Sequence, residues 1–339
     1  MAKILGIGNA LVDIMTSLED DILLTELKLP KGSMQLVDIN TSSVVLDASA
    51  HLRRQLTAGG SASNTIYGLA MLGVDTAFIG KIGKDEYGNV YKNDLLACKI
   101  IPRLYVSDTH SGRAVAFVST DSERTFATHL GAAIELVAED LVPDHFSGYQ
   151  YLHIEGYLVQ NYLLIRRAID LAGRYGLRVS LDLASYNVVE EHVEFLKKLI
   201  RESIDIVFAN EDEARALTGK PPEEAVEEIS GFCEIAVVKT GPGGSLVRRG
   251  DEFHRIGIIP ASPLDTTGAG DLYASGFLFG LIRGYDLKQS GDLGALLAGN
   301  IIEVLGARMD KQRWDRIREG VRRIGGMGGE TDVIQMSSG

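Results

Sequence analysis

Two aspartates enclose a glycine-rich turn in the segment Asp265-Thr-Thr-Gly-Ala-Gly-Asp271. The apolar stretch 272–281 follows directly and is typical of a helix. The first amides of a helix have no intrahelical partner and lie at its positive end, so they favour anions, and glycine lets them approach an anion closely. We therefore predict that the backbone amides of Gly268, Ala269 and Gly270 hold an anion while Asp271 removes a proton from a hydroxyl group.

A simpler interpretation of the same segment is a capping turn, with Asp265 or Thr266 as the N-cap of the helix. This interpretation accounts for one acid and one or two glycines. It does not account for threonines and alternating small residues between two aspartates. We favour a functional role for the segment.

A second set of residues could bind a polyol. Asn9 and Asp13 follow a predicted strand at 3–8, and a carboxylate can accept hydrogen bonds from two hydroxyls at once. The pair Gly59-Gly60 precedes a predicted helix at 63–72 that carries Asn64 near its start. Turn capping alone could explain both segments. A dinucleotide fingerprint at 6–11 fails, because its third glycine would fall at Leu11.

A third set of residues also follows predicted strands. Asn210 and Glu213 come after the strand at 204–209, although acids at a helix start also complement the helix dipole. The turn 240–244 comes after the strand at 235–239 and is equally consistent with a hairpin. Asn300 lies on a late helix that could flank a ligand or belong to the core.

The elements that must position these residues alternate along the chain. Short apolar runs at 76–79, 151–154, 178–183, 204–209 and 235–239 are separated by segments of helical period. This order predicts an α/β fold with a mostly parallel central sheet and helices on both faces, and such sheets bind ligands at the carboxyl ends of their strands. Residues 12–40 and 100–130 alternate polar and apolar side chains instead, which predicts antiparallel strands.

The segment 265–271 resembles the signature of the ribokinase (PfkB) family of carbohydrate and nucleoside kinases, and the similarity runs from Ile4 to about residue 310. The resemblance implies a ribokinase-like α/β kinase domain over 1–325. In it, 12–40 and 100–130 would form a small β-strand lid, and 326–339 would be a flexible tail. It also implies ATP-dependent phosphorylation of a primary hydroxyl, with Asp271 as the base.

The resemblance assigns roles to the residues already described. The acceptor would be bound by Asn9, Asp13, Gly59, Gly60 and Asn64, with Arg124 as a cation for the transferred phosphate. ATP would be bound by Asn210, Thr240, Gly241, Gly244, Asp265, Thr267 and Asn300. Glu213 would organise Mg²⁺, and many members of the family also need K⁺ beside the loop.

Three segments, 8–14, 111–133 and 265–277, are similar to adenosine kinases. The resemblance thus implies adenosine as the first candidate acceptor and a sugar such as ribose, fructose or a ketogluconate as the second. Leu36, Phe117, Phe126 and Tyr157 are candidate walls for a purine, from their positions alone. A non-catalytic nucleoside- or sugar-binding regulator is the alternative from another class, although such a protein would have no need of Asp271.

Composition narrows the classes further. The chain has 339 residues, of which 45% are hydrophobic and 24% charged, so a large core is expected. The net charge of −12 disfavours a nucleic-acid partner. No P-loop motif, metal-type cysteine or histidine spacing, signal segment or long apolar run is visible, so we expect a cytoplasmic protein with no membrane partner and with Cys98 and Cys233 as free thiols. Monomer and homodimer both remain open.

Overall fold

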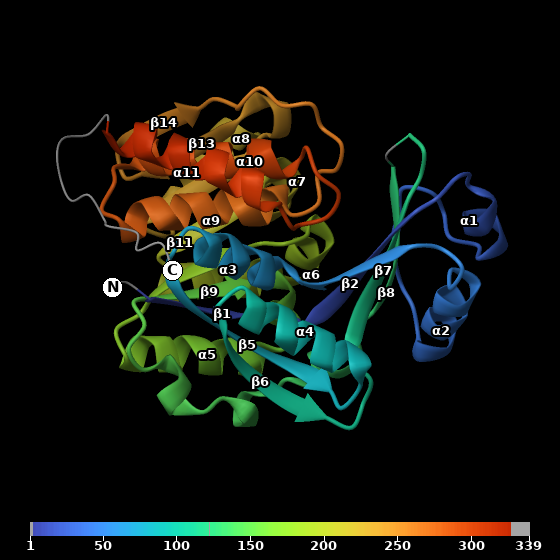
Figure 1. The fold of residues 1–339 in the computed structure, drawn as a ribbon. Helices are drawn as coiled ribbons and strands as arrows, with labels where there is room; N and C mark the ends of the chain where they lie inside the picture. Colours follow the sequence, from blue (N-terminus) through green and yellow to red (C-terminus); the bar gives the residue numbers. More distant parts are fainter. Residues whose placement is uncertain (1–2, 122, 327–339) are drawn as a thin grey trace, which may run out of the picture.

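A nine-stranded sheet forms the centre of the computed structural model, which describes residues 3–121 and 123–326 (Figure 1). Its strand order is β14-β13-β12-β11-β10-β9-β1-β5-β6. The strands from β12 to β6 in this order pair in parallel. Strand β13 pairs antiparallel with both β12 and β14. The strands are β1 (Lys3–Ile7), β5 (Asp75–Gly83), β6 (Ile101–Ser107), β9 (Tyr151–Glu155), β10 (Arg178–Asp182), β11 (Ile206–Asn210), β12 (Ile235–Lys239), β13 (Ser245–Arg249) and β14 (Glu252–Ile256).

Helices cover both faces of this sheet. One face packs against α3 (Ser61–Met71), α4 (Glu86–Ala97), α9 (Ala269–Ile282), α10 (Leu287–Ile301) and α11 (Lys311–Gly326). The other face packs against α5 (Tyr162–Arg174), α6 (Tyr186–Ser203), α7 (Glu211–Thr218) and α8 (Pro222–Ser230). Along β11, Phe208 belongs to the first core, and Val207 and Ala209 belong to the second, as the two-residue period of a strand requires. The predicted α/β fold is confirmed.

A second sheet of five strands lies to one side of this body (Figure 1). Its order is β3-β8-β7-β2-β4, with β2 (Leu11–Ser17), β3 (Met34–Leu36), β4 (Arg54–Gly59), β7 (Gly112–Val118) and β8 (Arg124–His129). Helices α1 (Ile22–Glu26) and α2 (Ile39–Ala48) pack on the face that carries Val12, Ile14 and Phe117. We call this unit the small sheet and its other face, which carries Asp13 and Met15, the front face.

The limits of the small sheet differ from those expected. Residues 101–107 form β6 at the edge of the central sheet, where none of their side chains is fully buried. Conversely, β4 extends the small sheet to Gly59, and two of its pairings, β2–β7 and β3–β8, are parallel rather than antiparallel.

Two further expectations concern the helices and the chain end. Helix α9 begins at Ala269, so Asp271 lies within its first turn rather than before it. Helix α11 extends to Gly326, and the rest of the predicted tail, 327–339, lies outside the described residues. Among the helices of residues 3–121 and 123–326, none has both the length and the apolar character needed to cross a membrane.

Candidate active site

Polar residues end five neighbouring parallel strands of the central sheet. In the order of the sheet, β12 ends at Lys239, β11 at Asn210, β10 at Asp182 and β9 at Glu155, and β1 leads through Gly8 into Asn9. Because parallel strands share one carboxyl edge, these side chains form a continuous polar row at the place where α/β sheets bind ligands. Three of the five, Glu155, Asp182 and Lys239, were not expected from the sequence.

Glu155 fixes the position of Asn9. One oxygen of its carboxylate accepts hydrogen bonds from the Asn9 backbone amide at 2.8 Å and from the Asn9 side chain at 2.7 Å. Its other oxygen accepts from the amide of Ala62 in the first turn of α3 at 3.2 Å. Burial raises the pKa of Glu155 to about 7, although these hydrogen bonds act in the opposite direction. Within the described residues, the side-chain carbonyl of Asn9 has no hydrogen-bond donor.

The two glycines before α3 make room for their neighbours. A Cβ on Gly59 would lie 2.2 Å from the carboxyl carbon of Asp13, so that carboxylate rests directly on the Gly59 backbone. Gly60 has a φ of 91° and faces the carbonyl of Asn9, which would meet a Cβ at 2.3 Å. Burial raises the pKa of Asp13 to about 7, and the nearby Arg308 lowers it only in part.

Asp271 lies beside this acceptor group and is held by α3. Its two carboxylate oxygens accept hydrogen bonds from the Ser61 hydroxyl at 2.8 Å and the Asn64 side-chain amide at 2.9 Å. Arg308 donates to the carbonyl oxygen of Asn64 at 3.0 Å, which orients the amide nitrogen toward Asp271. Desolvation and the negative charge of Asp182 raise the pKa of Asp271 to about 6. The structure brings Asn64 and Asp271 together, and both Ser61 and Arg308 are additions to the predicted set.

The loop before Asp271 presents free amides. Gly268 is the N-cap of α9 in the left-handed conformation, with a φ of 73°. Within the described residues, the amides of Gly268, Gly270 and Asp271 have no protein acceptor, whereas the amide of Ala269 donates to the Thr266 carbonyl at 3.2 Å. The anion site therefore offers the amides of two of the three residues expected, together with that of Asp271 itself.

Asp265 stabilises this loop through hydrogen bonds to backbone amides. Its carboxylate accepts hydrogen bonds from the amides of Thr267 and Gly306, both at 2.7 Å. Arg124 reaches from the small sheet to Asp265 at 2.6 Å and to the Thr266 hydroxyl at 2.9 Å. The predicted cation therefore lies beside the predicted phosphate loop, and it ties the small sheet to it.

Asn210 and Glu213 satisfy one another at the start of α7. The Asn210 side chain accepts from the Glu213 amide, and the Glu213 carboxylate accepts from the Asn210 backbone and side-chain amides, each at 2.8 Å. This is a capping box, and it adds to the favourable placement of acids at a helix start that the sequence suggested. Burial and the neighbouring Asp182 raise the pKa of Glu213 to about 7. Among the described residues, no three acidic, histidine or cysteine side chains are grouped so that they could hold a metal ion.

The remaining residues expected at a nucleotide lie on two elements. The turn after β12 closes with a hydrogen bond from the Thr240 amide to the Gly244 carbonyl at 2.8 Å, and Gly241 and Gly244 have φ values of 51° and 87°. Asn300 lies near the end of α10, where its side chain donates to the Leu296 carbonyl at 2.8 Å. Its amide is therefore engaged within its own helix.

The candidate purine walls divide between the two faces of the small sheet. Phe117 is fully buried on the face that packs against α1 and α2, so it is not a wall. Phe126 lies on the front face, in register with Ala116, and Leu36 lies in β3 opposite Thr128 and is 63% exposed. Tyr157 donates a hydrogen bond to the Ala184 carbonyl at 3.4 Å.

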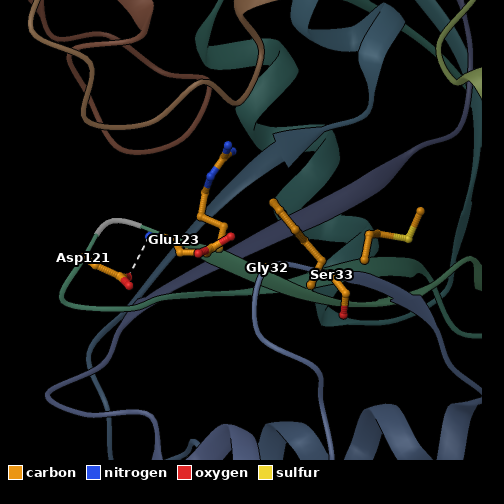
Figure 2. A pocket seen from close by; sticks show the side chains of 7 residues that line it. Gly32, Ser33, Asp121 and Glu123 are labelled. Atoms are coloured by element: carbon orange, nitrogen blue, oxygen red, sulfur yellow. Dashed lines mark hydrogen bonds between the residues drawn. The ribbon is translucent and has the colours of Figure 1, made fainter. Parts of the chain in front are cut away.

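A cavity of about 510 Å³ opens at the end of the small sheet (Figure 2). Its lining includes Met34 and Phe126 from the front face, together with Arg124. Asp121 and Glu123 line the hairpin side, where the Glu123 amide donates to Asp121 at 3.1 Å. Since Arg124 also contacts the phosphate loop, this cavity adjoins the predicted site.

Comparisons with known proteins identify the family of the chain. The model of the pfkB family carbohydrate kinases matches residues 37–313. The adenosine kinase of Sinorhizobium meliloti is 34% identical, with a TM-score of 0.84 over 94% of this chain and 99% of that one. A probable sugar kinase from Rhizobium etli is 31% identical, with a TM-score of 0.85 over 94% and 98%. An uncharacterised sugar kinase of Archaeoglobus fulgidus is 28% identical over 71% of this chain and 96% of its own length. The chain belongs to the PfkB family of carbohydrate kinases and is an ATP-dependent kinase.

Proposed function

We propose that this kinase phosphorylates a primary hydroxyl of a nucleoside, most specifically adenosine, with Asp271 as the general base. The observation that carries the proposal is the position of Asp271 in the first turn of α9. Its carboxylate is held by Ser61 and Asn64 beside amides that have no protein acceptor among the described residues. A carboxylate with a pKa near 6 is largely deprotonated at neutral pH and is still a better proton acceptor than an ordinary aspartate.

The proposed reaction exchanges one phosphorus–oxygen bond for another. The acceptor hydroxyl loses its proton to Asp271, and its oxygen forms a bond to the γ-phosphorus of ATP. The bond from that phosphorus to the bridging oxygen breaks, and its electrons remain on ADP. The amides of Gly268 and Gly270 would stabilise the charge on the phosphoryl oxygens during transfer.

The front face of the small sheet supports a nucleoside acceptor. Asp13 lies near one end of this face, where its carboxylate could accept hydrogen bonds from a ribose diol. Met15 and Ala116 are buried beneath this face, and the partly exposed side chains of Phe126, Met34 and Leu36 extend it as an apolar surface, on which a purine base could stack. The adjoining cavity, about 510 Å³, lies within the range of roughly 300–1,000 Å³ usual for small-molecule sites. In this proposal the small sheet is a lid over the acceptor.

A sugar acceptor is the second candidate. The sugar kinases among the similar proteins favour it. Asn9 and Asp13 also fit a sugar, because the hydrogen bonds proposed for them need only hydroxyl groups on the ligand. A plain sugar would leave the apolar front face around Phe126 without a partner. The adenosine kinase at 34% identity favours the nucleoside.

Two ions accompany the proposal. Glu213 and Asn210 would hold Mg²⁺ through water molecules, with the lone pairs that their oxygens keep beside the capping-box hydrogen bonds, and this ion would supply positive charge to the phosphates of ATP. We also propose a K⁺ site beside the loop, because the buried hydroxyl of Thr267 has no hydrogen-bond partner among the described residues. Replacing K⁺ by tetramethylammonium should then lower kcat, and unchanged activity would remove this site from the proposal.

A coupled assay of ADP release tests the function. The chain would be mixed with MgATP and, in turn, with adenosine, other nucleosides, ribose, fructose and ketogluconate. The proposal predicts the highest kcat/KM with adenosine and no comparable ADP release without an acceptor. Preference for a sugar would replace the acceptor but keep the mechanism. If none of the alcohols in the panel stimulated ADP release, the proposed acceptor classes would be contradicted.

A further inference from the structure

Lys239 is the cationic residue of the polar row, and its ammonium group lies against the predicted phosphate loop. Its Nζ donates to the Asp182 carboxylate at 2.9 Å. A Cβ built on Gly270 would meet this Nζ at 2.9 Å, so the ammonium group lies directly against the first turn of α9. The side chain is 15% exposed and therefore remains open to the site.

The ammonium group of Lys239 lies between charges of opposite effect. The first turn of a helix carries partial positive charge and repels an ammonium group beside it. The carboxylates of Asp182, Glu213 and Asp271 attract it, and they raise the pKa of Lys239 although burial lowers it. An ammonium group has three N–H donors, and within the described residues only Asp182 accepts one from Lys239. Two donors are therefore available to a ligand at the place where the free amides of the loop converge.

Lys81 provides an internal comparison. It forms an ion pair of the same length, 2.9 Å to Asp140, and its side chain has the same exposed fraction, 15%. Its Nζ also donates to the Glu135 carbonyl at 3.0 Å. Lys81 is thus bound by two protein acceptors, as expected of a structural ion pair, whereas Lys239 lies against the start of α9 with one acceptor among the described residues.

We propose that Lys239 is a catalytic residue that contacts the phosphoryl group in transit, with Asp182 as the residue that positions its ammonium group. This assignment rests on the proposed kinase reaction. It adds the full positive charge of a side chain to the backbone amides proposed to stabilise the phosphoryl group. The backbone amides of the loop and Lys239 would approach the phosphoryl oxygens together. Gly270 would be needed because any side chain at this position would displace Nζ.

The test compares Lys239→Met with Lys81→Met, a lysine of matched exposure and ion-pair length. We expect Lys239→Met to lower kcat by about 100-fold, as loss of one transition-state donor does elsewhere. Lys239→Arg should recover part of that loss, because it retains the charge. Adenosine binding without ATP, measured by calorimetry, should stay within about twofold in all three variants, because the lysine contacts only the phosphate. Lys81→Met should keep kcat within about twofold.

Removal of one partner leaves Asp182 buried and unpaired, which can prevent folding. The double variant Asp182→Asn/Lys239→Met removes both charges and should show the same loss of kcat, with Asp140→Asn/Lys81→Met as its control. If the Lys239 variants turn over like their controls, the assignment is wrong and the kinase proposal stands. If the wild-type chain phosphorylates no alcohol, the kinase reaction proposed above fails and the assignment falls with it.

Discussion

Gly59 gives the sharpest test of how the acceptor site is built. The Asp13 carboxylate rests on the Gly59 α-carbon, and a methyl group at this position would lie 2.2 Å from the carboxyl carbon. Ordinary van der Waals contact begins near 3.4 Å, so Gly59→Ala must move Asp13 by about 3.4 − 2.2 = 1.2 Å. The carboxylate belongs to β2 of the small sheet, whose pairing with β4 at Thr57 opposes this shift.

The size of the effect follows from that displacement. A misplacement of about 1 Å in a positioned group can cost about 100-fold in rate. We therefore expect Gly59→Ala to lower kcat/KM for the acceptor by about that factor. The affinity for ATP should change by less than about twofold, because the residues proposed for the nucleotide lie at the end of β11, in the turn after β12, in the loop before α9 and on α10. Overpacking should lower the free energy of unfolding by about 1–3 kcal/mol.

The assay is steady-state kinetics with the best acceptor, combined with urea denaturation. Gly173→Ala is the control, since a Cβ at this helical glycine of α5 meets no atom within 4 Å. That variant should keep its activity and gain slightly in stability. A folded Gly59→Ala protein with normal kcat/KM for the acceptor would refute the placement of Asp13 in the acceptor site.

Three further predictions concern the base, the small sheet and the core. With a pKa near 6, Asp271 becomes protonated as the pH falls, so kcat should decline below about pH 6. Asp182→Asn should move this decline to lower pH, because it removes a neighbouring negative charge. An unchanged pH profile of kcat would argue against the coupling of Asp182 and Asp271. Arg124→Ala removes both contacts with the phosphate loop and should lower kcat/KM by about tenfold, which steady-state kinetics would check, and normal kinetics would limit this arginine to a surface role. Tyr67→Phe leaves the buried Trp314 indole N–H without its acceptor and should lower the free energy of unfolding by about 1–3 kcal/mol in urea, with kcat unchanged.

The sequence predicted the residues that are close together along the chain. The loop 265–271 lies in one segment, so its glycines and acids could be recognised together, and their role follows from the physics of a helix start. Asn210 was expected because it follows an apolar strand run. Its capping box with Glu213 was also foreseeable from their spacing of three.

The residues missed are single polar side chains on separate elements. Glu155, Asp182 and Lys239 each end a buried strand, and only the order of strands in the sheet brings them together. A polar residue at the end of a parallel strand was the available signal, and it was used for Asn9, Asn210 and the turn 240–244 but not for these three residues. Arg308 lies far from Asn64 in the sequence, and no local pattern predicts their hydrogen bond.

The limits of the small sheet were also beyond the sequence pattern. An alternating segment predicts a strand with one exposed side, and this holds both for an edge strand of the central sheet and for a strand of the small sheet. Residues 101–107 are the former and 112–118 the latter. Only the pairing with β5 or β2 separates them, and pairing depends on tertiary contacts.

The most direct test of the central claim is transfer of radiolabelled γ-phosphate from ATP to adenosine by the wild-type chain and by Asp271→Asn, in single turnover. We predict transfer to a primary hydroxyl by the wild type and a rate at least about 100-fold lower for the variant, with thermal unfolding and ATP binding unchanged. Transfer by Asp271→Asn within about threefold of the wild-type rate would contradict the role of this aspartate as the base.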